Sequence, residues 1–182
     1  ASGICVHCQE SIPQGAALGG GSRDSARVLL GLNRLFETEL SREQLSELAT
    51  ELGSDVPFFL CETPAFCRGR GELVSPAPRP DPLPLLLLKP SFGVPTPWAY
   101  AHWKDSKEWR SIDYGPQNFT DTTFINHLER PVFEKFTFLA ELKQWLCAQA
   151  EVAVALMSGS GSTVFAVFHR AADAESLATR AR

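Results

Sequence analysis

The chain has 182 residues, of which 44% are hydrophobic and 21% are charged, and its formal net charge is -4. This composition is typical of a soluble globular protein and gives no support for the basic surface that nucleic-acid binding needs. No stretch reaches the roughly 18 consecutive apolar residues of a membrane helix. We therefore expect a cytoplasmic protein with one large domain or two small ones, and with neither a nucleic-acid nor a membrane partner.

Two cysteines near the start of the sequence, Cys5 and Cys8, have a spacing that also occurs in zinc and redox sites. Apolar and polar residues alternate around them, which predicts a strand over residues 4–12. Residues three apart in a strand point to opposite faces, so the two thiols are not expected to share a metal ion. We therefore expect neither a zinc nor a redox site at these cysteines, and we predict no cluster of metal-ligating side chains.

Two helices are expected after a glycine-rich turn at residues 13–22. The first is indicated by mainly apolar residues at a spacing of three and four: Ala26, Leu29, Leu30, Asn33 and Phe36. The second begins at Ser41, with Gln44 three residues later as in a capping box, and ends at Gly53. Its apolar stripe consists of Leu45, Leu48, Ala49 and Leu52.

Five of the ten residues from 75 to 84 are prolines, so this stretch is the expected domain boundary. A strand is expected before it, around residues 65–67. The elements expected after it are a strand at 85–88, a short helix at 98–103, a helix at 132–150, a hairpin of strands at 152–157 and 164–168, and a helix from about residue 171. Mixed helices and hairpins predict an α+β protein with two layers.

The segment Gly19-Gly20-Gly21-Ser22 lies between the first expected strand and helix. Residues without Cβ let backbone N–H groups crowd around an anion, and the helix adds unpaired N–H groups and the positive end of its dipole. Ser22 is expected to cap the helix and to offer its hydroxyl to phosphate or Mg²⁺. Neither a P-loop nor a dinucleotide fingerprint fits the spacing. The segment favours nucleotide phosphates, and a plain flexible turn is the alternative.

Residues 13–26 resemble the ATP loop of the GHMP kinases, typically Pro-x-Gly-x-Gly-Leu-Gly-Gly-Gly-Ser-Ser-Asn/Asp-Ala-Ala. Here they are Pro-Gln-Gly-Ala-Ala-Leu-Gly-Gly-Gly-Ser-Arg-Asp-Ser-Ala. Ala17 thus replaces a glycine, Arg23 a serine and Ser25 an alanine. The resemblance implies that ATP is bound by Pro13, Gly15, Leu18, Gly19, Gly20, Gly21, Ser22 and Arg23.

Residues 52–58, Leu-Gly-Ser-Asp-Val-Pro-Phe, resemble a second motif of the family, Leu-Gly-x-Asp-Val-Pro-Phe. The resemblance implies that Asp55 is the catalytic base, which accepts the proton of the substrate hydroxyl during phosphoryl transfer. From the local sequence alone, Asp55 is also a common kind of turn residue after a glycine that ends a helix.

Residues 158–165, Ser-Gly-Ser-Gly-Ser-Thr-Val-Phe, resemble the third motif of the family, although an ordinary flexible hairpin would have a similar sequence. The resemblance implies substrate contacts by Gly159, Ser160 and Gly161, and by Thr96, which follows Pro95 in a turn where the family usually has serine. Residues 126–129, Asn-His-Leu-Glu, resemble the family's Asn-Asp-Leu-Glu, with His127 in place of an acid and expected at the surface.

The resemblance implies a two-domain α+β GHMP kinase fold. Residues 1–75 would form a partial N-terminal ribosomal-protein-S5-like domain that binds ATP, and residues 76–182 a C-terminal ferredoxin-like α/β domain. The triple glycine favours the branch that uses ATP and Mg²⁺ to phosphorylate the 2-hydroxyl of 4-diphosphocytidyl-2-C-methyl-D-erythritol, a cytidine diphosphate methylerythritol, in non-mevalonate isoprenoid synthesis. A monomer or homodimer is expected.

The family also has a Pro-Ala-Lys-x-Asn-Leu segment, whose lysine acts with the aspartate, and an Asp-Gly-Tyr/Phe-His stretch. Neither string occurs in this sequence. We therefore expect the 182 residues to be an incomplete piece of such a kinase, inactive by itself. Two alternatives stay open: a non-catalytic nucleotide-binding relative, and a GHMP kinase for another small alcohol.

Overall fold

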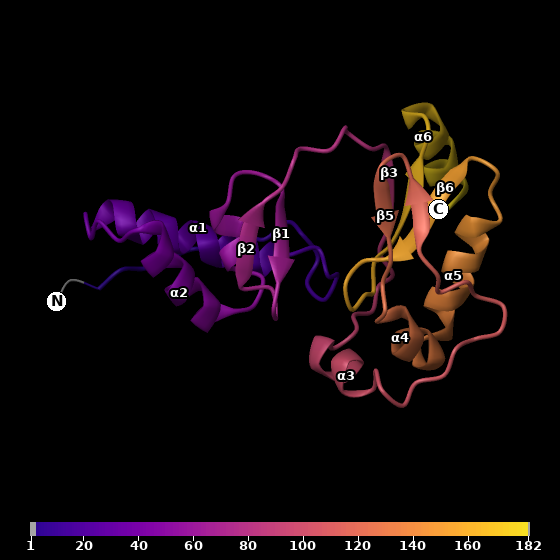
Figure 1. Ribbon diagram of the computed structural model, residues 1–182, viewed down its shortest axis with the longest axis horizontal. Helices are drawn as coiled ribbons and strands as arrows, with labels where there is room; N and C mark the ends of the chain where they lie inside the picture. Colours follow the sequence, from indigo (N-terminus) through magenta and orange to yellow (C-terminus); the bar gives the residue numbers. More distant parts are fainter. Residues whose placement is uncertain (1–2, 182) are drawn as a thin grey trace. The chain divides into compact units, whose positions relative to one another are not determined.

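The computed structural model describes residues 3–181 and divides the chain into two compact units (Figure 1). The first unit comprises the residues up to Pro13 together with Gly19–Asp81, and the second comprises Gln14–Leu18 together with the residues from Pro82 onward. The division after Asp81 falls in the proline-rich stretch. Within residues 3–181, no helix is both long and apolar enough to cross a membrane.

The first unit is formed by two helices, a short 3-10 helix and a hairpin. In chain order these are α1 (Gly20–Leu35), α2 (Arg42–Leu52), η1 (Pro57–Leu60), β1 (Ala65–Arg68) and β2 (Leu73–Pro76). The strands β1 and β2 pair antiparallel. A small apolar core joins α1, α2 and η1 and consists of Ala26, Leu45, Ala49, Val56 and Leu60.

The start of α2 confirms the predicted capping box. Ser41 Oγ accepts a hydrogen bond from the Gln44 amide at 3.3 Å, and the Ser41 amide donates to Gln44 Oε1 at 2.9 Å. These two bonds satisfy amide groups that the first helical turn would otherwise leave unpaired. Only half of the predicted apolar stripe is buried, because Leu48 and Leu52 are exposed.

The predicted strand over residues 4–12 is wrong. Residues 3–13 form neither strand nor helix, and Ile4 and Val6 are 48% and 53% exposed. Alternation of apolar and polar residues leads to a strand only if a partner strand is available. In the described part of the first unit, no strand pairs with these residues. Cys5 and Cys8 are free and exposed, and the Cys8 thiol donates to an Asp24 carboxylate oxygen at 3.2 Å.

The second unit contains a three-stranded sheet, a hairpin and four helices. In chain order these elements are β3 (Leu85–Leu88), α3 (Thr96–Ala101), β4 (Gln117–Phe119), β5 (Thr122–Phe124), α4 (Glu129–Lys135), α5 (Thr137–Cys147), β6 (Val152–Met157), β7 (Val164–Phe168) and α6 (Ala171–Arg180). The sheet has the order β3-β7-β6 with antiparallel pairs, and β4 pairs with β5 separately.

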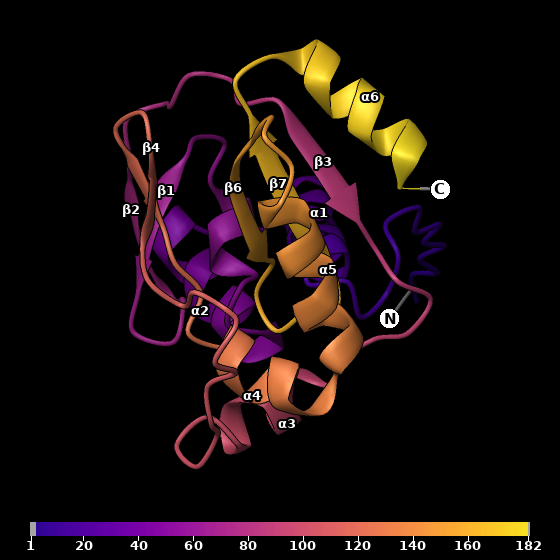
Figure 2. The same ribbon diagram turned by 90° about the vertical axis from the view of Figure 1, so that its right-hand side faces the viewer.

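The two faces of this sheet are both covered. Helices α5 and α6 pack on one face, in front of the sheet in Figure 2, and bury residues such as Met157 and Phe168. Hairpin β4–β5 packs on the other face, where Phe119 and Phe124 contact Val154 and Val167. Because side chains alternate along a strand, neighbouring residues of β6 and β7 enter different cores, which explains their nearly continuous apolar sequence.

The long helix predicted at 132–150 is instead two helices, α4 and α5, that meet at Phe136. Its backbone is not helical, with φ of -105° and ψ of 68°, and its ring packs against Phe92 at 5.8 Å and Trp98 at 5.6 Å between centroids. Residues on both sides of the break, such as Phe133 and Leu139, are buried in the same core. The apolar pattern therefore continues across the break and conceals it.

Replacing Ser41 with alanine should lower the free energy of unfolding by about 1 kcal/mol, because the cap of α2 is lost. Urea unfolding measures this change. Thr50→Ala is the matched control, since it removes a mid-helix hydroxyl that bonds only to Ser46 O and alanine has the higher helix propensity. Equal stability of Ser41→Ala and the unmodified protein would show that the capping box does not stabilise α2.

Candidate functional site

The glycine-rich segment forms the N-terminus of α1. Gly19 is the N-cap residue, with φ of 72° in the left-handed region that favours glycine. The helix begins at Gly20, so Ser22 lies inside its first turn and does not cap it, which corrects the predicted capping role. The N-cap glycine has no side chain with which to cap α1, and the first turn of the helix contains no acidic residue. The helix thus presents the positive end of its dipole, a favourable position for an anion.

Two of the three glycines are closely packed against side chains of the first unit. A Cβ on Gly19 would lie 2.6 Å from Cζ of Phe59, and a Cβ on Gly20 would overlap the Glu10 carboxylate. A Cβ on Gly21 would meet nothing within 4 Å. Gly21 therefore faces open space, while Glu10 places a negative charge beside the helix that would repel a second anion.

The other residues predicted to bind ATP lie on either side of these glycines. Pro13 and Arg23 belong to the first unit and are exposed, and the Arg23 amide donates to Gly19 O at 2.9 Å. Gly15 and Leu18 belong to the second unit. The predicted ATP-binding residues are thus divided between the units, with Gly19 to Arg23 on α1.

Asp55 lies in the turn between α2 and η1, in the same unit as the N-terminus of α1. The Val56 amide donates to Gly53 O at 3.1 Å, and Val56 is buried at 2% exposure, which fixes the turn while Asp55 stays exposed. Phe59, four residues after Asp55, contacts the Gly19 position. The segment that follows the predicted base thus packs against the start of the predicted phosphate-binding helix.

The second unit holds the first part of the ATP loop against the loop between β6 and β7. The Ser158 hydroxyl donates to Ala17 O at 2.7 Å, and the Ser162 amide donates to Gly15 O at 3.3 Å. A Cβ on Gly159 would lie 3.1 Å from Cβ of Ala17. Sequence reasoning gave no sign of these contacts, which join residues more than 140 positions apart.

Ala17, the residue in place of a family glycine, has φ of 53°. This left-handed conformation brings Cβ too close to the following carbonyl oxygen and costs about 1–2 kcal/mol for a residue other than glycine. The departure from the motif therefore has a local energetic cost, although the loop keeps its shape.

The β6–β7 loop brings together the four residues predicted to contact substrate. Gly159 and Gly161 have φ of 47° and 85°, which explains their identity. The hydroxyls of Ser160 and Thr96 hydrogen-bond at 2.7 Å. Within the described residues, the buried Thr163 hydroxyl has no hydrogen-bond partner. The loop thus presents glycine backbone and hydroxyl groups, as a polar ligand requires.

A buried ion pair beside this loop was not predicted from the sequence. Lys143 Nζ donates to Glu129 Oε2 at 2.6 Å, and the two residues are 2% and 1% exposed. Burial raises the pKa of the Glu129 carboxyl, and the Lys143 ammonium acts in the opposite direction. Glu129 belongs to the noted Asn-His-Leu-Glu motif, but Lys143 gave no signal, because a lysine in a helix usually faces solvent.

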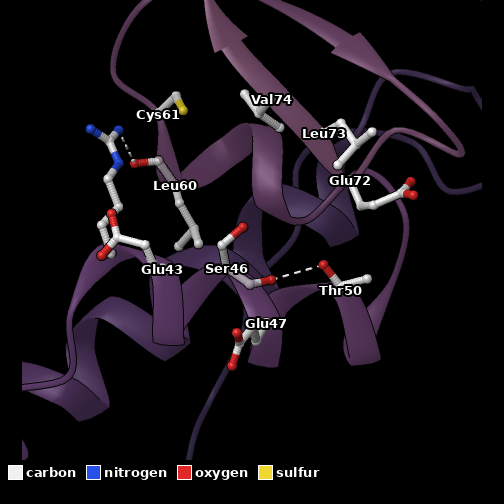
Figure 3. Close-up of a pocket in the computed structure, with 10 residues that line it drawn as sticks. Glu43, Ser46, Glu47, Thr50, Leu60, Cys61, Glu72, Leu73 and Val74 are labelled. Atoms are coloured by element: carbon white, nitrogen blue, oxygen red, sulfur yellow. Dashed lines mark hydrogen bonds between the residues drawn. The ribbon is translucent and has the colours of Figure 1, made fainter.

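A pocket of about 420 Å³ lies between α2 and the β1–β2 hairpin of the first unit (Figure 3). Its lining includes three carboxylates, Glu43, Glu47 and Glu72. Arg42 supplies a cation, but its guanidinium donates to Leu60 O at 3.2 Å. None of the predicted site residues lines this pocket, and its acidic lining does not suit a triphosphate.

Comparison with known families identifies the class of protein. The family model for the GHMP kinases N terminal domain matches residues 2–63, and the model for GHMP kinases C terminal matches residues 116–182. The chain therefore belongs to the GHMP kinases, which confirms the expected family and its two-domain α+β fold.

Individual relatives give a narrower comparison. The 4-diphosphocytidyl-2-C-methyl-D-erythritol kinases of Methylacidiphilum infernorum and Geobacter metallireducens are 43% and 40% identical over 93% and 92% of this chain. A crystal structure of 4-(cytidine 5'-diphospho)-2C-methyl-D-erythritol kinase matches 96% of this chain and 65% of its own, with a TM-score of 0.75 and 35% identity. The chain covers 59% and 60% of the two curated relatives, about three fifths of their length.

Replacing Ala17 with glycine should raise the free energy of unfolding by about 1 kcal/mol, because a residue with positive φ loses its Cβ. Ala16→Gly is the control: Ala16 is buried at 1% exposure, and its replacement should lower stability by about 0.5–1 kcal/mol. Denaturant unfolding of both variants compares the signs. A loss of stability in both would show that residue 17 is not strained.

Proposed function

We propose that this chain provides the ATP-binding helix and substrate loop of a kinase that phosphorylates the 2-hydroxyl of 4-diphosphocytidyl-2-C-methyl-D-erythritol. The observation that carries the proposal is the glycine-rich N-terminus of α1, in one unit with the exposed carboxylate of Asp55. The names of the relatives at 40% and 43% identity support the substrate. A cytoplasmic location, where ATP is available, is part of the same proposal.

In this proposal, the backbone amides of Gly20, Gly21 and Ser22 bind phosphate oxygens of ATP. They lie in the first turn of α1, where amide groups have no intrahelical partner. The exposed guanidinium of Arg23 adds positive charge, which partly offsets the carboxylate of Glu10 beside the same helix. Gly159–Gly161 and Thr96 contact the cytidine substrate through backbone and hydroxyl groups.

Mg²⁺ fits this site as a companion of ATP. The described residues include no group of three His, Cys, Asp or Glu side chains arranged to hold a metal ion. Mg²⁺ in kinases keeps several water ligands and is bound by substrate phosphates with few protein oxygens. We assign the Ser22 hydroxyl as the protein oxygen that would hold it. When bound, Mg²⁺ supplies positive charge that neutralises the charge developing on the phosphates.

Asp55 is the proposed general base. Its carboxylate is exposed. It is therefore available to accept the proton of the substrate hydroxyl as that oxygen forms its bond to the γ-phosphorus and the bond to the ADP oxygen breaks. Positioning and charge stabilisation supply the rest of the rate enhancement in this class of reaction.

A non-catalytic nucleotide-binding protein is the second candidate. It is favoured by Ala17, whose positive φ strains the ATP loop, and by Glu10, whose charge opposes phosphate. The two candidates differ in one measurement: a kinase releases ADP only when the cytidine substrate is present, whereas the alternative binds ATP without this turnover.

Replacing Asp55 with asparagine in the full-length protein should lower kcat by about 10²–10⁴-fold, the usual contribution of a general base. The Kd for ATP should stay nearly unchanged, because Asp55 does not bind phosphate in this mechanism. Coupled ADP-release and ATP-titration assays measure the two quantities. Asp81→Asn, at an exposed position of the same unit, is the control. Full activity of Asp55→Asn would exclude Asp55 as the base.

A further inference from the structure

Among residues 3–181, strand β6 has a neighbouring strand on only one of its edges. It pairs with β7, and in the order β3-β7-β6 it is the last strand of the sheet. The backbone groups of Ala155 and Met157 point to the other edge, and both residues are 1% exposed. Buried backbone N–H and C=O groups need hydrogen-bond partners, so this edge has to be satisfied by something other than a strand.

Side chains from residues 117–129 take the place of the absent neighbouring strand. Gln117 pairs with Ala155 through two bonds: Nε2 donates to Ala155 O at 2.9 Å, and the Ala155 amide donates to Oε1 at 3.0 Å. At the next outward-facing residue, the Met157 amide donates to Glu129 Oε1 at 2.8 Å, and Asn126 Nδ2 donates to Met157 O at 2.7 Å. Three side chains thus satisfy four backbone groups.

Asn126 extends this pairing beyond the strand. Its Nδ2 also donates to Gly159 O at 2.8 Å, so one amide group bridges the last residue of β6 and the second residue of the β6–β7 loop. Its Oδ1 accepts a hydrogen bond from the Leu128 amide at 2.9 Å, which fixes the side-chain orientation. The Gln117 side chain makes a similar pair of hydrogen bonds two residues earlier along β6, and both of its bonds go to Ala155.

The buried ion pair holds Glu129 in place. Lys143 Nζ donates both to Glu129 Oε2 at 2.6 Å and to Asp113 O at 2.9 Å. Burying two charges is costly, and apolar residues of similar volume often stabilise a protein as well or better. Stability alone therefore does not account for this pair. Its geometric effect is to aim the remaining oxygen, Oε1, at the Met157 amide.

We propose that Asn126 and Glu129 are positioning residues: they fix the point at which β6 ends and thereby orient Gly159, Ser160 and Gly161 toward the phosphoryl acceptor. The inference rests on the proposed function of this loop in binding the cytidine substrate. It gives a role to the Asn-His-Leu-Glu motif, in which the exposed His127 takes no part in the network.

The decisive comparison is Asn126→Asp against Gln117→Glu in the full-length protein. Each change keeps the shape and the accepting oxygen but replaces donation to a backbone carbonyl with carboxylate repulsion. We expect Asn126→Asp to lower kcat/KM for the cytidine substrate by at least about tenfold, as small misplacements of binding groups do. The Kd for ATP should stay within about twofold, and Gln117→Glu should change kcat/KM less than about twofold at a similar loss of Tm.

Equal losses of kcat/KM in the two variants, in proportion to their losses of Tm, would overturn the inference, because the network would then be merely structural. Hydrogen exchange separates this result from failure of the proposed function. The Gly161 amide, which donates to Ser158 O at 2.8 Å, should exchange at least about tenfold faster in Asn126→Asp and be unchanged in Gln117→Glu. Unchanged exchange in both variants would also overturn the inference, even if the protein turned over no cytidine substrate.

A second set of variants keeps the inference testable if Asn126→Asp does not fold. Glu129→Gln combined with Lys143→Met removes both charges but keeps an oxygen for the Met157 amide, and should retain kcat/KM within about threefold. Glu129→Leu combined with Lys143→Met removes that oxygen and should lose at least about tenfold. Equal activity of the two double variants would show that the bond to Met157 does not position the loop.

Discussion

The second unit depends on how the buried edge of strand β6 that has no neighbouring strand forms its hydrogen bonds. A strand that is buried on both faces and unpaired on one edge leaves backbone amides and carbonyls without water. In this protein three side chains from a single segment, Gln117, Asn126 and Glu129, supply the missing hydrogen bonds to β6. The same bonds determine where the strand stops, and so the position of the glycine- and serine-rich loop follows from a requirement of folding.

Local sequence signals predicted the elements that depend on local interactions. The capping box at Ser41 and the β6–β7 hairpin are formed by neighbouring residues, and both are confirmed. The strand at 4–12 was wrong because alternation says nothing of whether a partner strand is present. The break at Phe136 was missed because aromatic contacts with Phe92 and Trp98, distant in sequence, decide it.

The candidate site likewise combines features that short sequence motifs predict with features that depend on contacts between distant residues. Gly19, Gly20 and Asp55 were predicted as site residues from short motifs, and close packing explains why glycine occupies positions 19 and 20. The support of the β6–β7 loop could not be found in this way. Lys143 is a buried lysine on α5 whose partner, Glu129, is fourteen residues earlier in the chain, and no periodic pattern distinguishes it from a surface lysine.

The course of the chain limits how this protein can be dissected. Residues 14–18 pack with the second unit, whereas residues on both sides of them, up to Pro13 and from Gly19 to Asp81, belong to the first. A protease cut in the proline-rich stretch near Asp81 would therefore not release two self-sufficient pieces. The N-terminal piece would keep Gly15 and Ala17 but lose the Ser158 and Ser162 bonds that hold them. Limited proteolysis or gene splitting in this proline-rich stretch would thus separate residues 14–18 of the ATP loop from the β6–β7 loop to which they bond.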